Sequence, residues 1–332
     1  MKIGCIGTGA MGGAIMRAVC KKYDVSQIKV TDKNVAMGKA FAKETGATFV
    51  KANKDVLDCD YIFLAVKPQF LGDVFAEIAN KIPESAVVIS MAAGVKIEKL
   101  QAWAPQARFI RMMPNVPAQI GQGMTAISYG SNIKESEAKT AIEILSCAGR
   151  VEVVLEKLMD CVTAVSGSGP AFVFMFIEAM ADAAVRCGMP RAQAYTYAAQ
   201  TVYGSAGMVL ESGKIPAALK DMVSSPAGTT IEGIAALERN GFRNAVIEAL
   251  ADAAVRCGMP RAQAYTYAAQ TVYGSAGMVL ESGKHPAVLK DMVCSPAGTT
   301  IEGVAALEKN NFRNAVIEAV TAACDRSIAL GK

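Results

Sequence analysis

The chain has 332 residues, of which 52% are hydrophobic and 19% charged, a globular composition with room for two domains. Its formal net charge of +4 is spread along the sequence without a Lys/Arg block, which argues against a nucleic-acid partner. Nine cysteines without a Cys-x-x-Cys pair give no sign of a zinc site. The N-terminus lacks a signal-peptide pattern, and no uninterrupted apolar run reaches the about 18 residues that a membrane helix needs. We therefore expect a cytoplasmic protein with no bound metal and no membrane partner.

Residues 1–160 alternate short β-branched runs with helical patterns. Such alternation predicts an α/β fold with a Rossmann-like, doubly wound parallel sheet and helices on both faces. The predicted strands are residues 2–6, 28–31, 60–66, 86–90 and 108–112. The predicted helices are residues 10–22, 34–45 and 135–148. We expect residues 1–160 to form a dinucleotide-binding domain.

The first predicted strand runs directly into a glycine-rich turn, and a helical pattern follows. The turn consists of Gly7, Thr8, Gly9, Ala10, Met11 and Gly12. In this context the GxGxxG spacing is typical of a dinucleotide site, because its glycines permit a tight turn, a close pyrophosphate and close helix packing. The helix N-terminus would offer N–H groups and a positive dipole to the phosphates. We expect these residues to bind the cofactor.

The end of the second predicted strand gives a mixed signal about which cofactor binds. Asp32 lies twenty residues past Gly12, where an acid usually binds the ribose 2′-hydroxyl of NAD. Lys33 and Asn34 follow directly and could instead bind a 2′-phosphate. Asp32 could also be only a turn or helix-capping acid. The residues alone leave NADH and NADPH open.

From Cys161 onward the strand pattern stops, and Ala-rich helical segments predict an all-α domain over residues 161–332. Residues 181–250 (the first repeat) and 251–320 (the second repeat) align without a gap, each residue having its counterpart 70 positions away. The seven differences are Ile215/His285, Ala218/Val288, Ser224/Cys294, Ile234/Val304, Arg239/Lys309, Gly241/Asn311 and Leu250/Val320. Such near-identity indicates a very recent or an engineered duplication, and we favour an engineered one.

The repeats join without Gly or Pro, so we expect the last helix of the first repeat to continue into residues 251–258.

Each repeat contains the segment Ser-Pro-Ala-Gly-Thr-Thr, which predicts a loop followed by a helix N-terminus. The first threonine and the glutamate three residues later have the spacing of a capping box. The second threonine would then keep a free hydroxyl at a helix N-terminus suited to a small carboxylate. These residues are Thr229, Glu232 and Thr230 in the first repeat, and Thr299, Glu302 and Thr300 in the second.

Several motifs, in this order, resemble the pyrroline-5-carboxylate reductase family, which makes proline from its cyclic imine. The segments LKDMVSSPAGTTIEGIAALE and LKDMVCSPAGTTIEGVAALE resemble the C-terminal signature of that family. The resemblance extends to IGTGAMGGAI near the start, AVKPQ at 65–69, ISMAAGV at 89–95, RMMPNVPAQIGQGMTAI at 111–127 and AVSGSGPAFVF at 164–174. Ala10 departs from the pattern, since many relatives have Asn there.

The resemblance implies roles for particular residues. The glycine loop would hold the cofactor, generally NADPH with NADH often tolerated, together with Ala65, Val66, Lys67 and Pro68. Ala93, Gly94 and Asn115 would lie beside the nicotinamide and the substrate. The substrate carboxylate would be bound by Ser225, Gly228 and Thr229 of the first repeat, or by Ser295, Gly298 and Thr299 of the second. The second threonine, Thr230 or Thr300, would bond the ring nitrogen and take the catalytic role.

The reaction implied by the resemblance needs few ionisable side chains. Hydride passes from C4 of the nicotinamide to the C=N carbon of 1-pyrroline-5-carboxylate, while the nitrogen gains or already holds a proton. Positioning in a dry pocket can supply much of the rate. The single histidine, His285, is replaced by Ile215 in the first repeat, so we expect it at the surface without a catalytic role.

The duplication suggests a single-chain pseudo-dimer. In the family this chain resembles, the C-terminal helices of two chains interlock, so a second helical copy could replace the partner chain. We expect a monomeric pseudo-dimer, with a homodimer as the alternative, and such threading would allow a knotted backbone. Two other functions remain open: a designed or decayed scaffold that binds nucleotide without turnover, and a 3-hydroxyacid dehydrogenase relative. The absence of lysine from residues 161–186 counts against the dehydrogenase.

Overall fold

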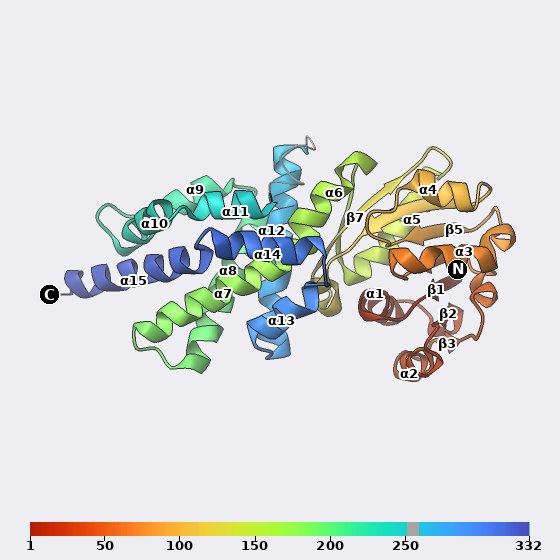
Figure 1. The fold of residues 1–332 in the computed structure, drawn as a ribbon, viewed down its shortest axis with the longest axis horizontal. Helices are drawn as coiled ribbons and strands as arrows, with labels where there is room; N and C mark the ends of the chain where they lie inside the picture. The colour runs from red at the N-terminus through yellow and green to blue at the C-terminus, as the bar shows by residue number, and fades with distance from the viewer. Residues whose placement is uncertain (251–258, 332) are drawn as a thin grey trace. The chain divides into compact units, whose positions relative to one another are not determined.

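The computed structural model describes residues 1–250 and 259–331. Contacts divide the chain into two compact units, Met1–Asp160 and Cys161–Lys332 (Figure 1). The expected continuation of a helix across residues 251–258 lies outside the described residues.

The first unit contains an eight-stranded sheet with the order β3-β2-β1-β4-β5-β6-β7-β8. Its strands are β1 Ile3–Ile6, β2 Ile28–Thr31, β3 Thr48–Phe49, β4 Tyr61–Leu64, β5 Val87–Ser90, β6 Arg108–Met113, β7 Gly123–Tyr129 and β8 Gly149–Val153. The order 3-2-1-4-5-6 is that of a Rossmann sheet, whose strand order reverses between β1 and β4. The predicted sheet and its five predicted strands are confirmed, whereas β3, β7 and β8 had not been predicted.

Helices cover both faces of this sheet. They are α1 Ala10–Cys20, α2 Val35–Thr45, α3 Leu71–Ile78, α4 Ile97–Trp103 and α5 Glu135–Leu145. One core cluster joins Ile15 of α1 to Phe63 of β4, and another joins Phe75 of α3 to Leu64 of β4. Successive residues of β4 thus contribute to opposite faces, as a doubly wound sheet requires. The three predicted helices correspond to α1, α2 and α5, and α3 and α4 are additional.

One strand pair departs from the predicted parallel arrangement. Strands β6 and β7 are antiparallel, with Met112 opposite Ile127. Only residues 114–122 connect them, which is too short for the crossover that parallel neighbours need. The short connection therefore imposes the reversal.

The described part of the second unit contains helices and turns without strands, as predicted. It begins within α6 Met159–Val162, which a π-helical turn, Thr163–Ser168, joins to α7 Gly169–Arg186. The other helices are α8 Arg191–Ser212, α9 Pro216–Met222, α10 Thr229–Arg239, α11 Phe242–Leu250, α12 Arg261–Ser282, α13 Pro286–Val293, α14 Thr299–Lys309 and α15 Phe312–Leu330.

One helical stretch in the described chain, Glu156–Arg186, is long and apolar enough to span a membrane by length and composition alone. The most apolar window of this stretch is 67% buried inside the protein, as expected of a core helix. Ala171, Met175 and Ala179 of α7 belong to the core of the second unit.

Residues of the two repeats contact their own counterparts. The rings of Tyr203 and Tyr273 stack with centroids 4.0 Å apart, and their hydroxyl groups are hydrogen-bonded. The rings of Phe242 and Phe312 stack with centroids 5.4 Å apart. A residue lies beside its own counterpart where a local two-fold axis relates two copies of a segment. Helices α8 and α12, which carry the tyrosines, are therefore packed in a symmetric manner.

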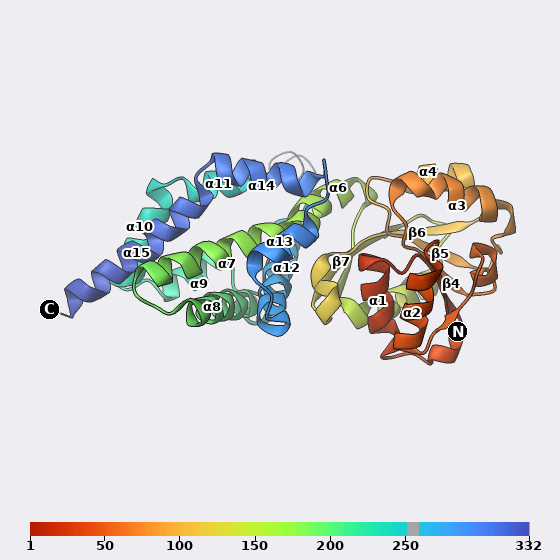
Figure 2. The ribbon, with the colours of Figure 1, turned by 60° about the horizontal axis from the view of Figure 1, so that its bottom comes forward.

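The remaining helix pairs are reciprocal. Helix α10 packs on α15, and α14 packs on α11 (Figure 2). Helices α10 and α14 are counterparts, as are α11 and the first half of α15. Each pairing is therefore the exchanged version of the other, which is the contact pattern of an isologous interface.

The surroundings of the two repeats are nevertheless unequal. Tyr197 of α8 is 64% exposed, whereas its counterpart Tyr267 of α12 is 0% exposed. Helix α7 and the π-helical turn before it occur only once in the described chain, and Gly169 packs close to Thr271 of α12. Identical sequences thus acquire different environments in one molecule.

Candidate functional site

The glycine loop lies at the carboxyl end of β1, at the point where the strand order reverses. Gly7 has a φ of 101°, and a methyl group built on it would lie 2.5 Å from the Ala65 carbonyl oxygen. A methyl group on Gly12 would clash with the Gly7 carbonyl and with Ala65. Gly9, the N-cap of α1, has open space where a side chain would be. The tight turn at Gly7, the close packing at Gly12 and the open space at Gly9 are the backbone features that a dinucleotide-binding loop requires.

The start of α1 is free to receive an anion. No side chain caps this helix, and no acid lies in its first turn, which includes Ala10 and Met11. Its first N–H groups therefore lack intrahelical partners and carry the positive end of the helix dipole. Behind the loop, burial raises the pKa of the Cys5 thiol, and its Sγ donates to the Gly7 carbonyl at 3.3 Å.

The other predicted cofactor residues follow neighbouring strands of the same sheet. Ala65, Val66, Lys67 and Pro68 follow β4, and the Ala65 N–H donates to the Ile6 carbonyl at 2.8 Å. Ala93 and Gly94 follow β5 and are exposed, with Gly94 at a φ of 73°. Because these strands are parallel, the structure brings these segments to the sheet edge that carries the glycine loop, where ligands bind in open α/β sheets.

The residues after β2 have partners within the protein. One oxygen of Asp32 accepts from the Thr8 N–H at 2.7 Å and from the Thr8 hydroxyl at 2.9 Å. The other accepts from the Asn34 N–H at 2.8 Å, and Asn34 itself caps α2. Lys33 is exposed, with Nζ 5.7 Å from the centroid of the Phe70 ring. Asp32 thus holds the glycine loop in shape, while Lys33 is the exposed cation of the trio.

Asn115 is buried, at 1% exposure, directly after β6. Its Oδ1 accepts from the Met124 N–H at 2.8 Å, which fixes the side chain against β7. Its Nδ2 has no hydrogen-bond partner in the described chain. An unsatisfied buried donor costs about 1–3 kcal/mol. A ligand acceptor, such as a carboxamide or carboxylate oxygen, would remove that cost.

These observations fit a dinucleotide cofactor. Gly7 and Gly12 leave no room for a side chain, Gly9 leaves the loop open, and the first N–H groups of α1 suit a pyrophosphate. A nicotinamide, when bound there, would supply the hydride.

The Ser-Pro-Ala-Gly segment of each repeat forms a tight turn. The glycine N–H donates to the serine carbonyl at 3.1 Å, from Gly228 to Ser225 and from Gly298 to Ser295. The alanine before each glycine has a positive φ, 54° at Ala227 and 53° at Ala297. A left-handed alanine costs roughly 1–2 kcal/mol, and backbone strain of this kind is concentrated at functional sites. The turn thus directs the chain into α10 or α14.

The predicted capping boxes are wrong. Gly228 and Gly298 are the N-caps, and Thr229 and Thr299 are already the first helical residues. With each glycine as the N-cap, the helix starts one residue too early for the threonine to be its cap. Neither helix has a side-chain cap, so the N–H groups of the first turn are available to a carboxylate.

The two loops differ in what surrounds them. Thr300 is 7% exposed and its hydroxyl donates to Ser168 Oγ at 3.0 Å. Thr230 is only half-buried. In the same first-repeat loop, the Ala227 carbonyl accepts from Arg326 Nε at 2.8 Å. Ser168 was not predicted from the sequence, although it lies in the AVSGSGPAFVF motif at 164–174. In the structure it stands out because it ends a π-helical turn.

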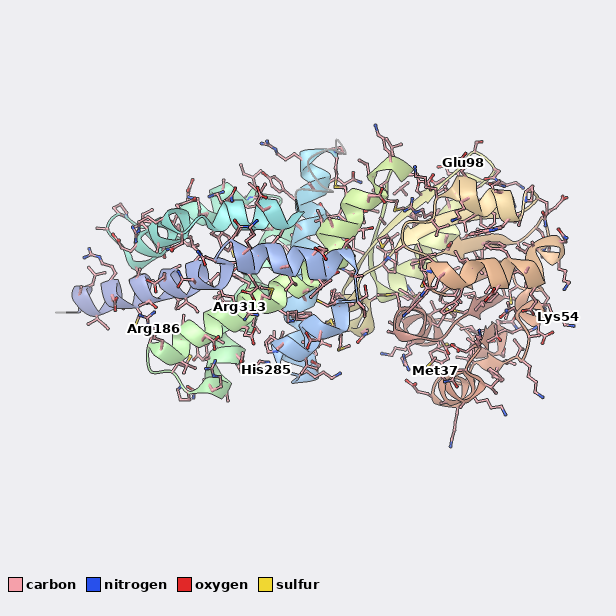
Figure 3. All side chains as sticks on the ribbon, viewed as in Figure 1. Met37, Lys54, Glu98, Arg186, His285 and Arg313 are labelled. Atoms are coloured by element: carbon pink, nitrogen blue, oxygen red, sulfur yellow. The ribbon has the colours of Figure 1, made fainter. Side chains whose placement is uncertain are left out.

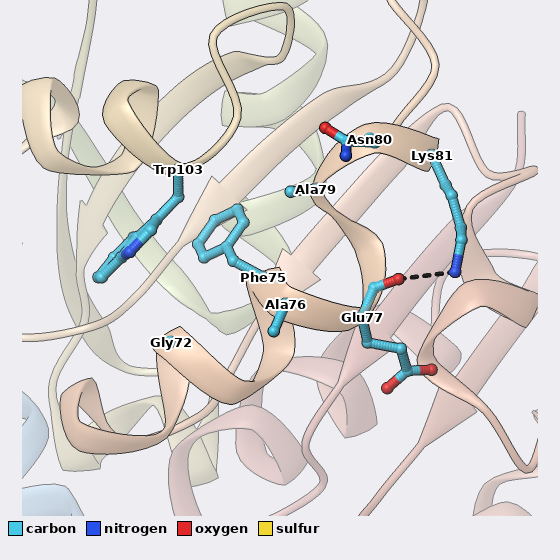
Figure 4. A pocket seen from close by; sticks show the side chains of 8 residues that line it. All are labelled: Gly72, Phe75, Ala76, Glu77, Ala79, Asn80, Lys81 and Trp103. Atoms are coloured by element: carbon cyan, nitrogen blue, oxygen red, sulfur yellow. Dashed lines mark hydrogen bonds between the residues drawn. The ribbon is translucent and has the colours of Figure 1, made fainter.

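Two further features lie away from the predicted residues. His285 caps α13, accepting from the Ala287 N–H at 3.1 Å, and it is exposed as expected (Figure 3). A hollow of about 410 Å³ beside α3 is lined by Phe75, Trp103 and Lys81, among others (Figure 4). None of the predicted site residues lines it, and we assign it no role.

Comparison with known proteins identifies the family. A family model for pyrroline-5-carboxylate reductase dimerisation matches residues 156–250 and again residues 244–330. A model for NADP oxidoreductase, coenzyme F420-dependent, matches residues 2–94. The pyrroline-5-carboxylate reductase of Escherichia coli (strain K12) is 46% identical over 253 residues, which are 75% of this chain and 94% of that protein. The chain belongs to the pyrroline-5-carboxylate reductase family.

Further members of this family support the assignment. The reductase of Methanosarcina acetivorans is 44% identical over 261 residues, covering 77% of this chain and 96% of that protein. A solved reductase from Coxiella burnetii superposes with a TM-score of 0.72 at 31% identity, over 77% of this chain and 97% of that one. A solved reductase from Plasmodium falciparum, with NADP bound, gives a TM-score of 0.67 at 28% identity, over 82% of this chain and 98% of that one.

Family membership confirms the expected reaction class, an NAD(P)H-dependent reduction of 1-pyrroline-5-carboxylate to proline. It also confirms the enzyme class and excludes the 3-hydroxyacid dehydrogenase alternative. The dimerisation model indicates a helical unit of the kind that forms homodimers.

Proposed function

We propose that this chain reduces 1-pyrroline-5-carboxylate with NADPH, and that its helical unit is a pseudo-dimer with one working substrate loop. The reaction follows from the family. The proposal of a single working substrate loop rests on one observation: of the two identical loops, only the second-repeat loop is hydrogen-bonded to Ser168. Residues 1–160 then serve as the cofactor domain and residues 161–332 as the substrate domain.

The proposed cofactor preference rests on Asp32, Lys33 and Asn34, which follow β2. Both Asp32 oxygens already accept hydrogen bonds from Thr8 and Asn34, so this carboxylate is poorly placed to take the ribose 2′-hydroxyl of NADH as its main partner. The exposed ammonium of Lys33 suits a 2′-phosphate. NADPH is therefore the preferred cofactor, with NADH tolerated.

The substrate is bound by the second-repeat loop. The N–H groups of Thr299 and Thr300, at the start of a helix whose N-cap makes no side-chain bond, take its carboxylate, and the Thr300 hydroxyl orients the ring nitrogen. Asn115 Nδ2 offers a donor to the nicotinamide or the substrate. Hydride adds to the C=N carbon and the π electrons move to nitrogen, which already holds or gains a proton, giving the ring amine of proline.

The pseudo-dimer rests on symmetric contacts. The Tyr203–Tyr273 and Phe242–Phe312 pairs, with the reciprocal helix pairs, are the contacts that two separate chains would make across a two-fold axis. One chain then supplies both halves of its helical unit. The near-identity of the repeats supports an engineered duplication. The backbone knot and the cytoplasmic location stay predictions.

The proposal is tested by activity and mass together. We expect imine-dependent oxidation of NADPH with formation of proline, and a mass by light scattering near the 34.8 kDa of one chain. Binding of NADPH without oxidation would instead indicate a nucleotide-binding scaffold. A mass of two chains or more would contradict the pseudo-dimer while leaving the reaction in place.

A further inference from the structure

Three hydroxyl groups meet where the second-repeat loop contacts the π-helical turn. Ser168 Oγ accepts from the Thr300 hydroxyl at 3.0 Å, and it lies 3.3 Å from Thr299 Oγ1. Ser168 is 3% exposed and Thr300 is 7% exposed, so water does not compete freely for either group. These side chains are the direct link between the start of α14 and the turn before α7.

The local structure holds Ser168 tightly in this position. It ends the π-helical turn Thr163–Ser168, a distortion that is often found at functional sites. Gly169 follows, and a methyl group built on it would lie 2.9 Å from Thr271 Cγ2. Pro170 at the start of α7 restricts the backbone further. Ser168 therefore has little freedom to turn away from the threonines.

The hydrogen bond determines what Thr300 can offer a substrate. A hydroxyl has one proton, and in this arrangement the Thr300 proton is directed to Ser168. The remaining lone pairs of Thr300 Oγ1 can only accept. A protonated imine presents an N–H that such an acceptor can bind, whereas a neutral imine presents a lone pair that it cannot.

We infer that Ser168 is a positioning residue that fixes Thr300 as a hydrogen-bond acceptor and so selects the protonated, iminium form of the substrate. The inference rests on the proposed function of the second-repeat loop. The step balances without a protein acid: hydride leaves NADPH for the C=N carbon, the π electrons pass to a nitrogen that already carries its proton, and NADP⁺ remains.

The first repeat shows what happens without this serine. Its loop has the same two threonines, but the described chain contains one π-helical turn, and no hydrogen bond from Thr230 to a counterpart of Ser168 is present there. Among the described residues, Thr230 thus has no group that directs its proton, although the loop sequence is identical.

The test is the pH profile of Ser168→Ala in the full chain. In the unchanged chain, kcat/KM should fall as rising pH depletes the iminium. In Ser168→Ala we expect kcat/KM at low pH to fall about tenfold, the magnitude of one lost hydrogen bond. The decline with pH should become shallower, because Thr300 can then donate to the neutral imine. The dissociation constant of NADPH should not change.

Ser166→Ala is the matched control. This buried serine lies in the same turn, but its hydroxyl donates to the Val162 carbonyl at 2.9 Å and not to the loop. The control should keep the original pH profile. If Ser168→Ala does not fold, Ser168→Cys, which keeps the shape of the side chain but is a weaker acceptor, should show an intermediate profile.

An unchanged profile in a folded Ser168 variant, or the same change in the control, would overturn the inference. Such a result would leave the proposed function intact, since the unchanged chain would still oxidise NADPH. Absence of imine-dependent oxidation in the unchanged chain would instead reject the proposed function itself.

Discussion

The loops at 225–230 and 295–300 have the same six residues and nearly the same backbone. Each has a left-handed alanine, at 54° and 53°, and a glycine N-cap without a side-chain cap. Only their neighbours differ: Ser168 contacts the second loop, and Arg326 of α15 contacts the first. The six-residue motif thus specifies the local conformation of the loop, whereas the surrounding fold determines whether that conformation forms a site.

The imbalance has a simple origin in the chain. The repeated segment begins at residue 181, within α7, so the π-helical turn and the first part of α7 precede the first repeat. The symmetric contacts use only residues that occur twice, such as Tyr203 with Tyr273. The unequal contacts use residues that precede the first repeat, such as Ser168 and Glu178. Matched substitutions in the two repeats therefore measure the imbalance directly.

The largest difference in stability is expected between Phe312→Ala and Phe242→Ala. Phe312 is 3% exposed and belongs to the core with Val316, whereas Phe242 is only partly buried at the edge of this core. Deleting a buried phenylalanine costs about 3–5 kcal/mol, and a half-buried one should cost roughly half of that. Urea unfolding of both variants checks this. Equal losses would mean that the repeats are equally packed.

A smaller difference in the free energy of unfolding is expected between Arg313→Ala and Arg243→Ala. Arg313 pairs with Glu178 of α7 and with Glu308, and its side chain is 29% exposed. Arg243 pairs with Glu238 at 2.6 Å, and its side chain is 66% exposed. We expect a loss of about 1–2 kcal/mol at Arg313, because Glu178 is left half-buried without its partner, and less than about 0.5 kcal/mol at Arg243.

Thermal and urea unfolding of the two arginine variants, measured side by side, would show whether their losses of unfolding free energy differ as expected. A loss at Arg243 as large as that at Arg313 would show that α7 does not distinguish the repeats.

The smallest effect on stability is expected at the symmetric pair of Tyr203 and Tyr273. The hydrogen bond to Tyr273, with burial, raises the pKa of Tyr203 from 10.0 to about 12. The stabilisation from a raised pKa is fully present below pH 10 and is lost as the pH rises towards 12. The free energy of unfolding should therefore decline between pH 10 and pH 12, and less so in Tyr203→Phe. Identical slopes would contradict the pairing.

Much of the first unit could be predicted from sequence. Strands such as Ile3–Ile6 and Tyr61–Leu64 are buried on both faces, and continuous apolar runs signal them clearly. Strand β8 was missed because Gly149–Val153 contains Arg and Glu and is only partly buried. Strand β3 has only two residues, too few for any periodicity.

The site was predictable in its residue types but not in its contacts. The glycine loop and the Ser-Pro-Ala-Gly turns follow from local backbone rules. The capping boxes failed because the spacing of Thr299 and Glu302 cannot reveal that Gly298 is the N-cap. Ser168 was missed as a partner because it is 132 residues from Thr300, and only the folded chain brings them together.

The most direct test of one working loop is the kinetics of Thr300→Ala beside Thr230→Ala. We predict that Thr300→Ala lowers kcat/KM about 100-fold, as expected for a lost orienting group at a reacting nitrogen, while Thr230→Ala changes it less than about twofold. NADPH affinity should be unchanged in both variants. Equal losses in the two variants, or a larger loss at Thr230, would contradict the account.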